Sequence, residues 1–204
     1  MEYNQRRKLQ AKQTEQRILQ AALALMREHG YENVSVRDIC RQAGITTGAF
    51  YHHFPSKEAL IAKGFGALDN YMKQALEGRG EEPPAQRLRT ILTAYADFME
   101  QESGELTTRY YLTRLSNVNA GIRLDPTNYT KRAMVDCFRQ ARDRGDFIES
   151  RTPEWAADFC YCHFRGVVLD WLLSGFSYSL RERMLDDYDA FLTFFGGTPG
   201  AKKA

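Results

Sequence analysis

The sequence predicts an all-helical protein. Apolar residues recur every three or four positions along most of the chain. No run of alternating apolar and polar residues, rich in β-branched side chains, indicates a strand. One segment rich in glycine and proline, 78–84, divides the chain in two. We therefore expect about nine helices, three in an N-terminal domain and the remainder in a larger C-terminal part.

The composition is that of an ordinary globular protein. The chain has 204 residues, 43% apolar and 26% charged, which suits one large domain or two small ones. No apolar run approaches the roughly 20 residues of a membrane helix, and the polar, basic N-terminus does not resemble a secretory leader. We therefore expect a cytoplasmic protein with no membrane partner, whose four cysteines are reduced thiols.

The charge is unevenly distributed. The net charge is only +2, but residues 1–63 hold ten basic and six acidic residues, a net +4. The remainder of the chain has a net charge of −2, from eighteen basic and twenty acidic residues. Such an asymmetry favours a nucleic acid as the partner of the N-terminal part, which opens with the basic arm Arg6-Arg7-Lys8.

The N-terminal helices have recognisable ends. The first is expected from about Lys12 to His29, before Gly30. A short second helix should run from about Val36 to Ala43, because Ser35 and Asp38 form a capping box.

A glycine and a proline separate the next two helices. Gly44 can adopt a left-handed turn conformation, and a third helix is expected over about 46–53. Pro55 ends it, and Ser56 caps a fourth helix that reaches to about Leu76.

The C-terminal helices are also marked by capping residues. Asp125-Pro126 and Thr152-Pro153 each place proline at a first helical position. Ser179 begins a capping box, and Gly196-Gly197 provides a stop. The five expected helices cover about 85–101, 105–118, 126–144, 153–174 and 180–195.

Residues 35–54 match a helix-turn-helix. Two short helices flank a glycine turn, and apolar residues can form a seam between them: Val36, Ile39, Cys40, Ala43, Ile45, Phe50 and Phe54. In such a motif the second helix enters the DNA major groove.

The exposed residues of the second helix suit contacts with DNA. Thr46 and Thr47 offer hydroxyls, Gly48 permits close approach of the DNA backbone, and Tyr51 and His52 can reach outward. At the start of the following helix, a lysine can contact phosphate: Lys57.

This region resembles the DNA-binding domain of the TetR/AcrR family of bacterial transcriptional regulators. The resemblance covers about Thr14 to Ala62. It rests on Ile18-Leu-Gln-Ala-Ala22, Gly30-Tyr31, Val34-Ser-Val-Arg-Asp-Ile39, Ala43-Gly-Ile-Thr46, Gly48 and Phe50-Tyr-His-His-Phe-Pro-Ser-Lys-Glu-Ala-Leu60.

The resemblance implies where DNA is contacted. DNA-contacting positions of the family fall on Thr46, Thr47, Gly48, Tyr51, His52 and Lys57, and phosphate-contacting positions on Thr14 and Arg37. Position 47 is often basic in relatives and is threonine here, so we rank Tyr51 and Lys57 above Thr47.

The resemblance also implies a domain plan. Residues 1–55 would form the helix-turn-helix domain, 56–77 a connecting helix, and 78–204 a helical domain for effector binding and dimerisation. Regulators of this type are homodimers that bind palindromic double-stranded DNA and usually pair their last two helices. We therefore expect a ligand-responsive regulator, most simply a repressor released from its operator by a small molecule.

An effector site is expected among the aromatic residues of the C-terminal part, with a few polar anchors. The candidates are Phe98, Arg109, Tyr110, Arg114, Phe138, His163 and Trp171. We expect no cofactor and no metal.

Two other functions are weighed. Cys160 and His163 share a helix face, which would suit a redox- or metal-responsive regulator, although Cys162 lies roughly opposite Cys160. A helical ligand-binding or scaffold protein without a DNA role is the second alternative. No hydrolase or metalloprotease motif is present, so we do not expect an enzyme.

Overall fold

The computed structural model describes residues 2–101, 104–116, 129–146 and 151–194, with the side chains of residues 2–4, 67, 114, 193 and 194 excepted. In these ranges every regular element is helical, which confirms the predicted fold class. The chain divides into two compact units, one of residues 1–67 with 105–120 and one of residues 68–104 with 121–204. Each unit is described by itself.

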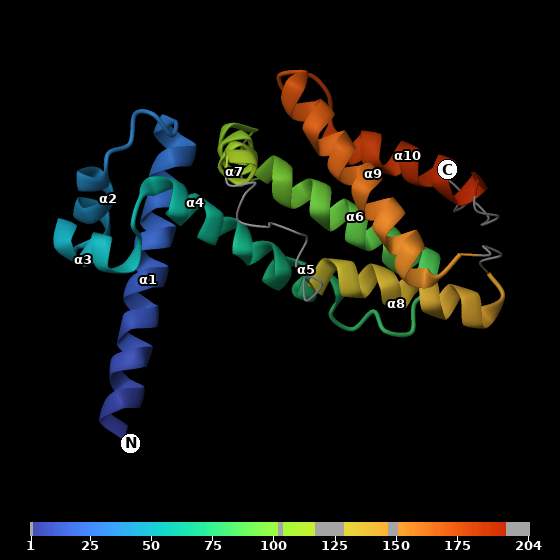
Figure 1. The fold of residues 1–204 in the computed structure, drawn as a ribbon, viewed down its shortest axis with the longest axis horizontal. Helices are drawn as coiled ribbons and strands as arrows, with labels where there is room; N and C mark the ends of the chain where they lie inside the picture. The colour runs from blue at the N-terminus through green and yellow to red at the C-terminus, as the bar shows by residue number, and fades with distance from the viewer. Residues whose placement is uncertain (1, 102–103, 117–128, 147–150, 195–204) are drawn as a thin grey trace. The chain divides into compact units, whose positions relative to one another are not determined.

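The first unit contains the helix-turn-helix and one helix from much later in the sequence. Its elements are α1 (Glu2–His29), α2 (Val36–Ala43), α3 (Thr47–His53), α4 (Lys57–Gly64), the 3-10 turn η1 (Phe65–Ala67) and α7 (Gly104–Ser116), of which residues from Glu105 onward belong here. α1 packs against α2 and α4, as Figure 1 shows. Their core is fully apolar: Ile18, Ala22, Met26, Ile39, Phe50, Leu60 and Ile61 are each at most 1% exposed.

Two expected boundaries in this unit are wrong. α1 begins at Glu2, ten residues before the expected Lys12, because residues 2–11 contain no glycine or proline to stop a helix. The expected continuous helix over 56–77 is instead α4, η1 and a separate helix α5 (Leu68–Leu76). Two glycines, Gly64 and Gly66, explain the break, since glycine is a poor helix former.

The second unit is built around one central helix, α6 (Pro84–Gln101). The unit comprises α5, α6, α8 (Tyr129–Arg144), α9 (Pro153–Leu173) and α10 (Leu180–Phe194). α6 packs against all four of the others (Figure 1). Accordingly, α6 buries nine residues: Pro84, Leu88, Ile91, Leu92, Ala94, Tyr95, Ala96, Phe98 and Met99.

The predicted caps of α9 and α10 are present. Thr152 Oγ1 accepts a hydrogen bond from the Trp155 amide at 3.1 Å, and Ser179 Oγ accepts one from the Glu182 amide at 3.2 Å. The other two predicted signals, Asp125-Pro126 and Gly196-Gly197, lie outside the described residues. Among the described helices, none combines the length and apolar character needed to cross a membrane.

Candidate nucleic-acid interface

The geometry of the helix-turn-helix follows from its caps. Ser35 and Asp38 form the predicted capping box at the start of α2, and Gly44 adopts the left-handed conformation at φ 64°. The Gly44 and Ile45 amides then donate to carbonyls of Arg41 and Cys40, at 3.3 and 3.0 Å. These bonds set the angle at which α3 leaves the turn.

The expected start of α3 shifts by one residue. Thr46 is the N-cap rather than the first helical residue, and its Oγ1 accepts a hydrogen bond from the Ala49 amide at 3.2 Å. The lone pairs of this hydroxyl therefore serve the helix, while its O–H remains able to donate.

α3 buries one face and presents the other. Phe50 is completely buried, whereas Thr47, Gly48, Tyr51 and His52 are exposed. Tyr51 is 54% exposed and meets Phe50 edge to face, with 5.3 Å between the ring centroids. A large aromatic side chain is thus held outward by the core residue beside it.

No contact within the first unit requires glycine at position 48. A Cβ there would meet only Thr46 Oγ1, at 4.0 Å, and the φ angle is not in the left-handed region. Arg37 on α2 is also exposed. Thr14 on α1 is half-buried, and its Oγ1 donates to the Gln10 carbonyl at 2.9 Å.

Lys57 makes contacts within the first unit that the sequence did not predict. Its Nζ donates to the carbonyl oxygens of Tyr31 at 2.8 Å and Val34 at 2.7 Å, and lies 4.0 Å from the centroid of the Tyr31 ring. An ammonium has three N–H donors, so only one is left for a phosphate. Lys57 therefore holds the α1–α2 connection against α4. A contact of its third N–H donor with DNA stays a prediction.

Tyr31 is the centre of the contacts around the α1–α2 connection, which we call the Tyr31 corner. Its hydroxyl donates to Glu58 Oε1 at 2.6 Å, and its amide donates to Glu105 Oε1 of α7 at 3.1 Å. Arg109 of α7 lies over the same ring at 4.9 Å and pairs with Glu32. Burial, followed by the hydrogen bond to Glu58, raises the pKa of Tyr31, and the same bond lowers the pKa of Glu58.

The predicted effector residues do not all fall in one unit. Arg109 and Tyr110 lie on α7 in the first unit, where Arg109 is engaged as described and Tyr110 stacks on Phe65 with 4.2 Å between centroids. Arg114 lies on the same helix, but its side chain is outside the description.

The remaining candidates lie on three helices of the second unit. Phe98, Phe138 and Trp171 are buried, and Trp171 Nε1 donates to the Tyr178 carbonyl at 3.0 Å. His163 is exposed on α9, with its Nε2 3.1 Å from Asp187 Oδ2 of α10.

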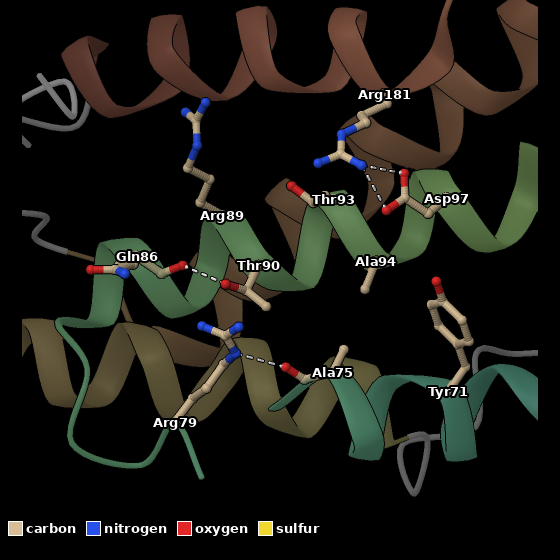
Figure 2. Close-up of a pocket in the computed structure, with 10 residues that line it drawn as sticks. All are labelled: Tyr71, Ala75, Arg79, Gln86, Arg89, Thr90, Thr93, Ala94, Asp97 and Arg181. Atoms are coloured by element: carbon tan, nitrogen blue, oxygen red, sulfur yellow. Dashed lines mark hydrogen bonds and ion pairs between the residues drawn. The ribbon is translucent and has the colours of Figure 1, made fainter. Parts of the chain in front are cut away.

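Figure 2 shows a groove of about 410 Å³ in the second unit that the sequence did not reveal. It follows the polar outer stripe of α6, between α5 and α10, and contains none of the predicted effector residues. Its three arginines each pair with a carboxylate: Arg79 with Glu82, Arg89 with Asp189, and Arg181 with Asp97. The groove is therefore polar but locally neutral.

The cysteines do not form a metal centre in the described residues, where no group of three potential ligands occurs. Cys160 is fully buried, whereas His163 is exposed and its Nε2 lies 3.1 Å from Asp187 Oδ2. Burial raises the pKa of the Cys137 thiol to about 11 and that of Cys160 further still. Both thiols stay protonated at neutral pH and are poor nucleophiles.

Residues 18–63 match the family model "Bacterial regulatory proteins, tetR family". The HTH-type transcriptional repressor DhaR of Mycobacterium sp. (strain GP1) is 25% identical over 185 residues, which cover 87% of this chain and 88% of DhaR. The HTH-type regulator UidR of Escherichia coli (strain K12) is 46% identical over 52 residues, only 26% of either chain.

The similarity of fold extends over almost the whole chain. Thermus thermophilus FadR, a TetR-family repressor solved in complex with lauroyl-CoA, superposes with a TM-score of 0.59. The match covers 93% of this chain and 97% of FadR, at 18% sequence identity. At that identity the match establishes the shared fold.

The role of Lys57 predicts a loss of stability on substitution. Lys57→Met keeps the length of the side chain but removes the ammonium donor from two carbonyls, of which that of Tyr31 keeps a second, longer bond from the Val34 amide at 3.4 Å. This should lower the free energy of unfolding by about 2 kcal/mol. Urea denaturation measures it. The control, Lys63→Met, removes only an exposed ion pair with Glu15 and should cost less than about 1 kcal/mol. Equal losses in both variants would contradict the role given to Lys57.

The Tyr31–Glu58 bond predicts a dependence of stability on pH. A carboxyl whose pKa is lowered on folding stabilises the protein above its unfolded value, here 4.5, and this contribution disappears as the pH falls through the folded pKa. Tyr31→Phe removes the donor, so its stability deficit relative to wild type should shrink between pH 7 and pH 3. Unfolding curves across that range test this, and a constant deficit would show that the bond is unimportant.

Proposed function

The chain belongs to the TetR family of bacterial regulatory proteins, and we propose that it is a ligand-responsive, dimeric transcriptional regulator. Each subunit would place α3 in the major groove of one half of a palindromic operator. The observation that carries this proposal is the exposed face of α3, where Thr47, Gly48, Tyr51 and His52 stand on a helix fixed at both ends by caps. Binding to chromosomal DNA implies a cytoplasmic location.

The exposed residues of α3 support direct reading of base edges. Hydroxyl, imidazole and phenol groups can exchange hydrogen bonds with bases, and the side-chain hydrogen at position 48 allows close approach of the sugar-phosphate backbone. Arg37 and Thr14, together with the third donor of Lys57, would contact phosphates and set the orientation of α3.

An exposed apolar stripe on α9 supports dimerisation. Trp155, Phe159, Leu169 and Leu173 are 37 to 79% exposed and recur at helical spacing, with Cys162 and Gly166 between them. Such a stripe on a single chain marks an interaction surface. We propose that α9 pairs with α9 of a second copy, beside α10, which would give the protein the two-fold symmetry of its operator.

The effector is proposed to bind in the second unit. Phe98, Phe138 and Trp171 come from α6, α8 and α9, and each is buried beside another aromatic ring, which supports a largely apolar ligand. The lauroyl-CoA complex of the Thermus thermophilus protein and the repressor name of DhaR support release from an operator by a small molecule as the mode of regulation. The ligand would act by favouring one of two arrangements of the paired α3 helices.

The reading role of α3 is tested with Tyr51→Ala. The wild-type protein first enriches its preferred sequences from a random duplex pool, and binding to the enriched duplex is then measured by fluorescence anisotropy. Loss of Tyr51 should weaken this binding by about 10-fold or more. Tyr71→Ala, which removes a tyrosine from α5 in the second unit, should leave it unchanged. Undiminished binding by Tyr51→Ala would overturn the assignment of α3.

The dimer surface is tested with Leu169→Glu. Two buried carboxylates at the symmetric contact should dissociate the dimer into chains of 23.5 kDa, as measured by light scattering after gel filtration. Leu115→Glu is a matched control, because Leu115 is a leucine of similar exposure, 58%, on a different helix, α7 of the first unit. A dimer that survives Leu169→Glu would place the interface elsewhere.

A further inference from the structure

The positive charge of the N-terminal region is concentrated on the first half of α1. Residues 5–13 hold four basic residues and no acidic ones, a net +4. Residues 14–63, which contain the whole helix-turn-helix, hold six basic and five acidic residues, a net of only +1. The part of the chain that reads DNA is therefore almost neutral without the segment before it.

Three of the six basic residues at 14–63 are also engaged within the first unit. Arg41 lies 3.5 Å from Asp38, Lys63 lies 2.9 Å from Glu15, and Lys57 binds two carbonyls. These charges are partly satisfied before any phosphate approaches. DNA-binding proteins obtain much of their affinity from phosphate neutralisation, so another source of positive charge is needed.

The first half of α1 is available to supply it. Residues 5–13 are all exposed, and the helix projects beyond α2 and α3 at its N-terminal end (Figure 1). Arg6, Lys8 and Lys12 form no ion pair among the described residues. A polar helix that buries no face gains nothing from packing within its own chain.

The arrangement of the cations favours a phosphate backbone over base edges. At 100° per residue, Arg6, Arg7, Lys8 and Lys12 are spread over about 240° of the helix circumference rather than along one stripe. Such a distribution neutralises charge from several directions but presents no single face to a groove. The one large apolar residue in this stretch, Leu9, does not provide the continuous apolar face that a membrane-bound helix needs.

We propose that residues 2–13 form a rigid, helical basic arm that docks on the DNA phosphate backbone outside the half-site read by α3. At 1.5 Å per residue, these twelve residues extend about 18 Å, which is about five base pairs of duplex. The arm would supply most of the salt-dependent, sequence-independent binding, while α3 supplies the sequence preference. Only the part of this inference that concerns the complex with a specific operator rests on the proposed function.

The test replaces the four cations by glutamine, which keeps the length and the helix propensity: Arg6→Gln, Arg7→Gln, Lys8→Gln and Lys12→Gln in one full-length variant. A matched control removes four exposed cations from the second unit: Lys73→Gln, Arg132→Gln, Arg142→Gln and Arg144→Gln. Affinity for a duplex of arbitrary sequence is measured against salt concentration, so the assay does not depend on knowing the operator.

The plot of log affinity against log salt should lose about 0.9 units of slope for each phosphate contact removed, up to about 3.6 per subunit. The control variant should keep the wild-type slope. An arm variant with an unchanged slope, or equal losses in both variants, would overturn the proposal. A loss of binding only to vesicles of phosphatidylserine and phosphatidylcholine would also overturn it, in favour of a membrane surface.

The two proposals fail in different ways. If Tyr51→Ala left sequence preference intact while the arm variant lost its salt dependence, α3 would not be the reader but the arm would still bind phosphate. On the enriched duplex, hydroxyl-radical cleavage should show about five protected base pairs outside each half-site for the wild type and none there for the arm variant. Protection that persists in the arm variant would contradict the docking position.

Discussion

The contact on which the DNA-reading unit depends is that of Lys57 with the corner around Tyr31. A short connection between α1 and α2 leaves backbone carbonyls that need donors, and the Lys57 ammonium satisfies two of them while lying over the Tyr31 ring. Because Lys57 is the first residue of α4, this contact fixes α4 to the corner that leads into α2. Because α3 lies between α2 and α4 in sequence, its position is thereby fixed at both ends. A helix that must fit a DNA groove requires such a fixed position.

The Tyr31 corner also explains why α7 belongs to the first unit. Glu105 accepts from the Tyr31 amide, and Gly30 lets this carboxylate approach, since a Cβ at Gly30 would lie 3.3 Å from Glu105 Oε2. Arg109 adds a second contact over the Tyr31 ring. A helix that follows α6 in sequence is thus bonded to the connection that leads into the helix-turn-helix.

The sequence predicted what local chemistry determines. The capping box at Ser35, the left-handed turn at Gly44 and the caps at Thr152 and Ser179 are encoded by a few adjacent residues, and all are present. It did not predict the second role of Lys57 or the position of α7, because both depend on partners 23 to 77 residues away. The effector residues stay a prediction, since aromatic side chains of a core and of a pocket look alike in one sequence.

The central claim is that the first unit, held together by the contacts of Lys57 and Tyr31, presents α3 to DNA. A photo-crosslinking residue at position 51 tests it most directly, with the same residue at position 71 of the second unit for comparison. After irradiation with the duplex that the wild-type protein enriches, we expect a covalent protein–DNA product from position 51 and none from position 71. A product from position 71, or none from position 51 while the duplex remains bound, would contradict the account.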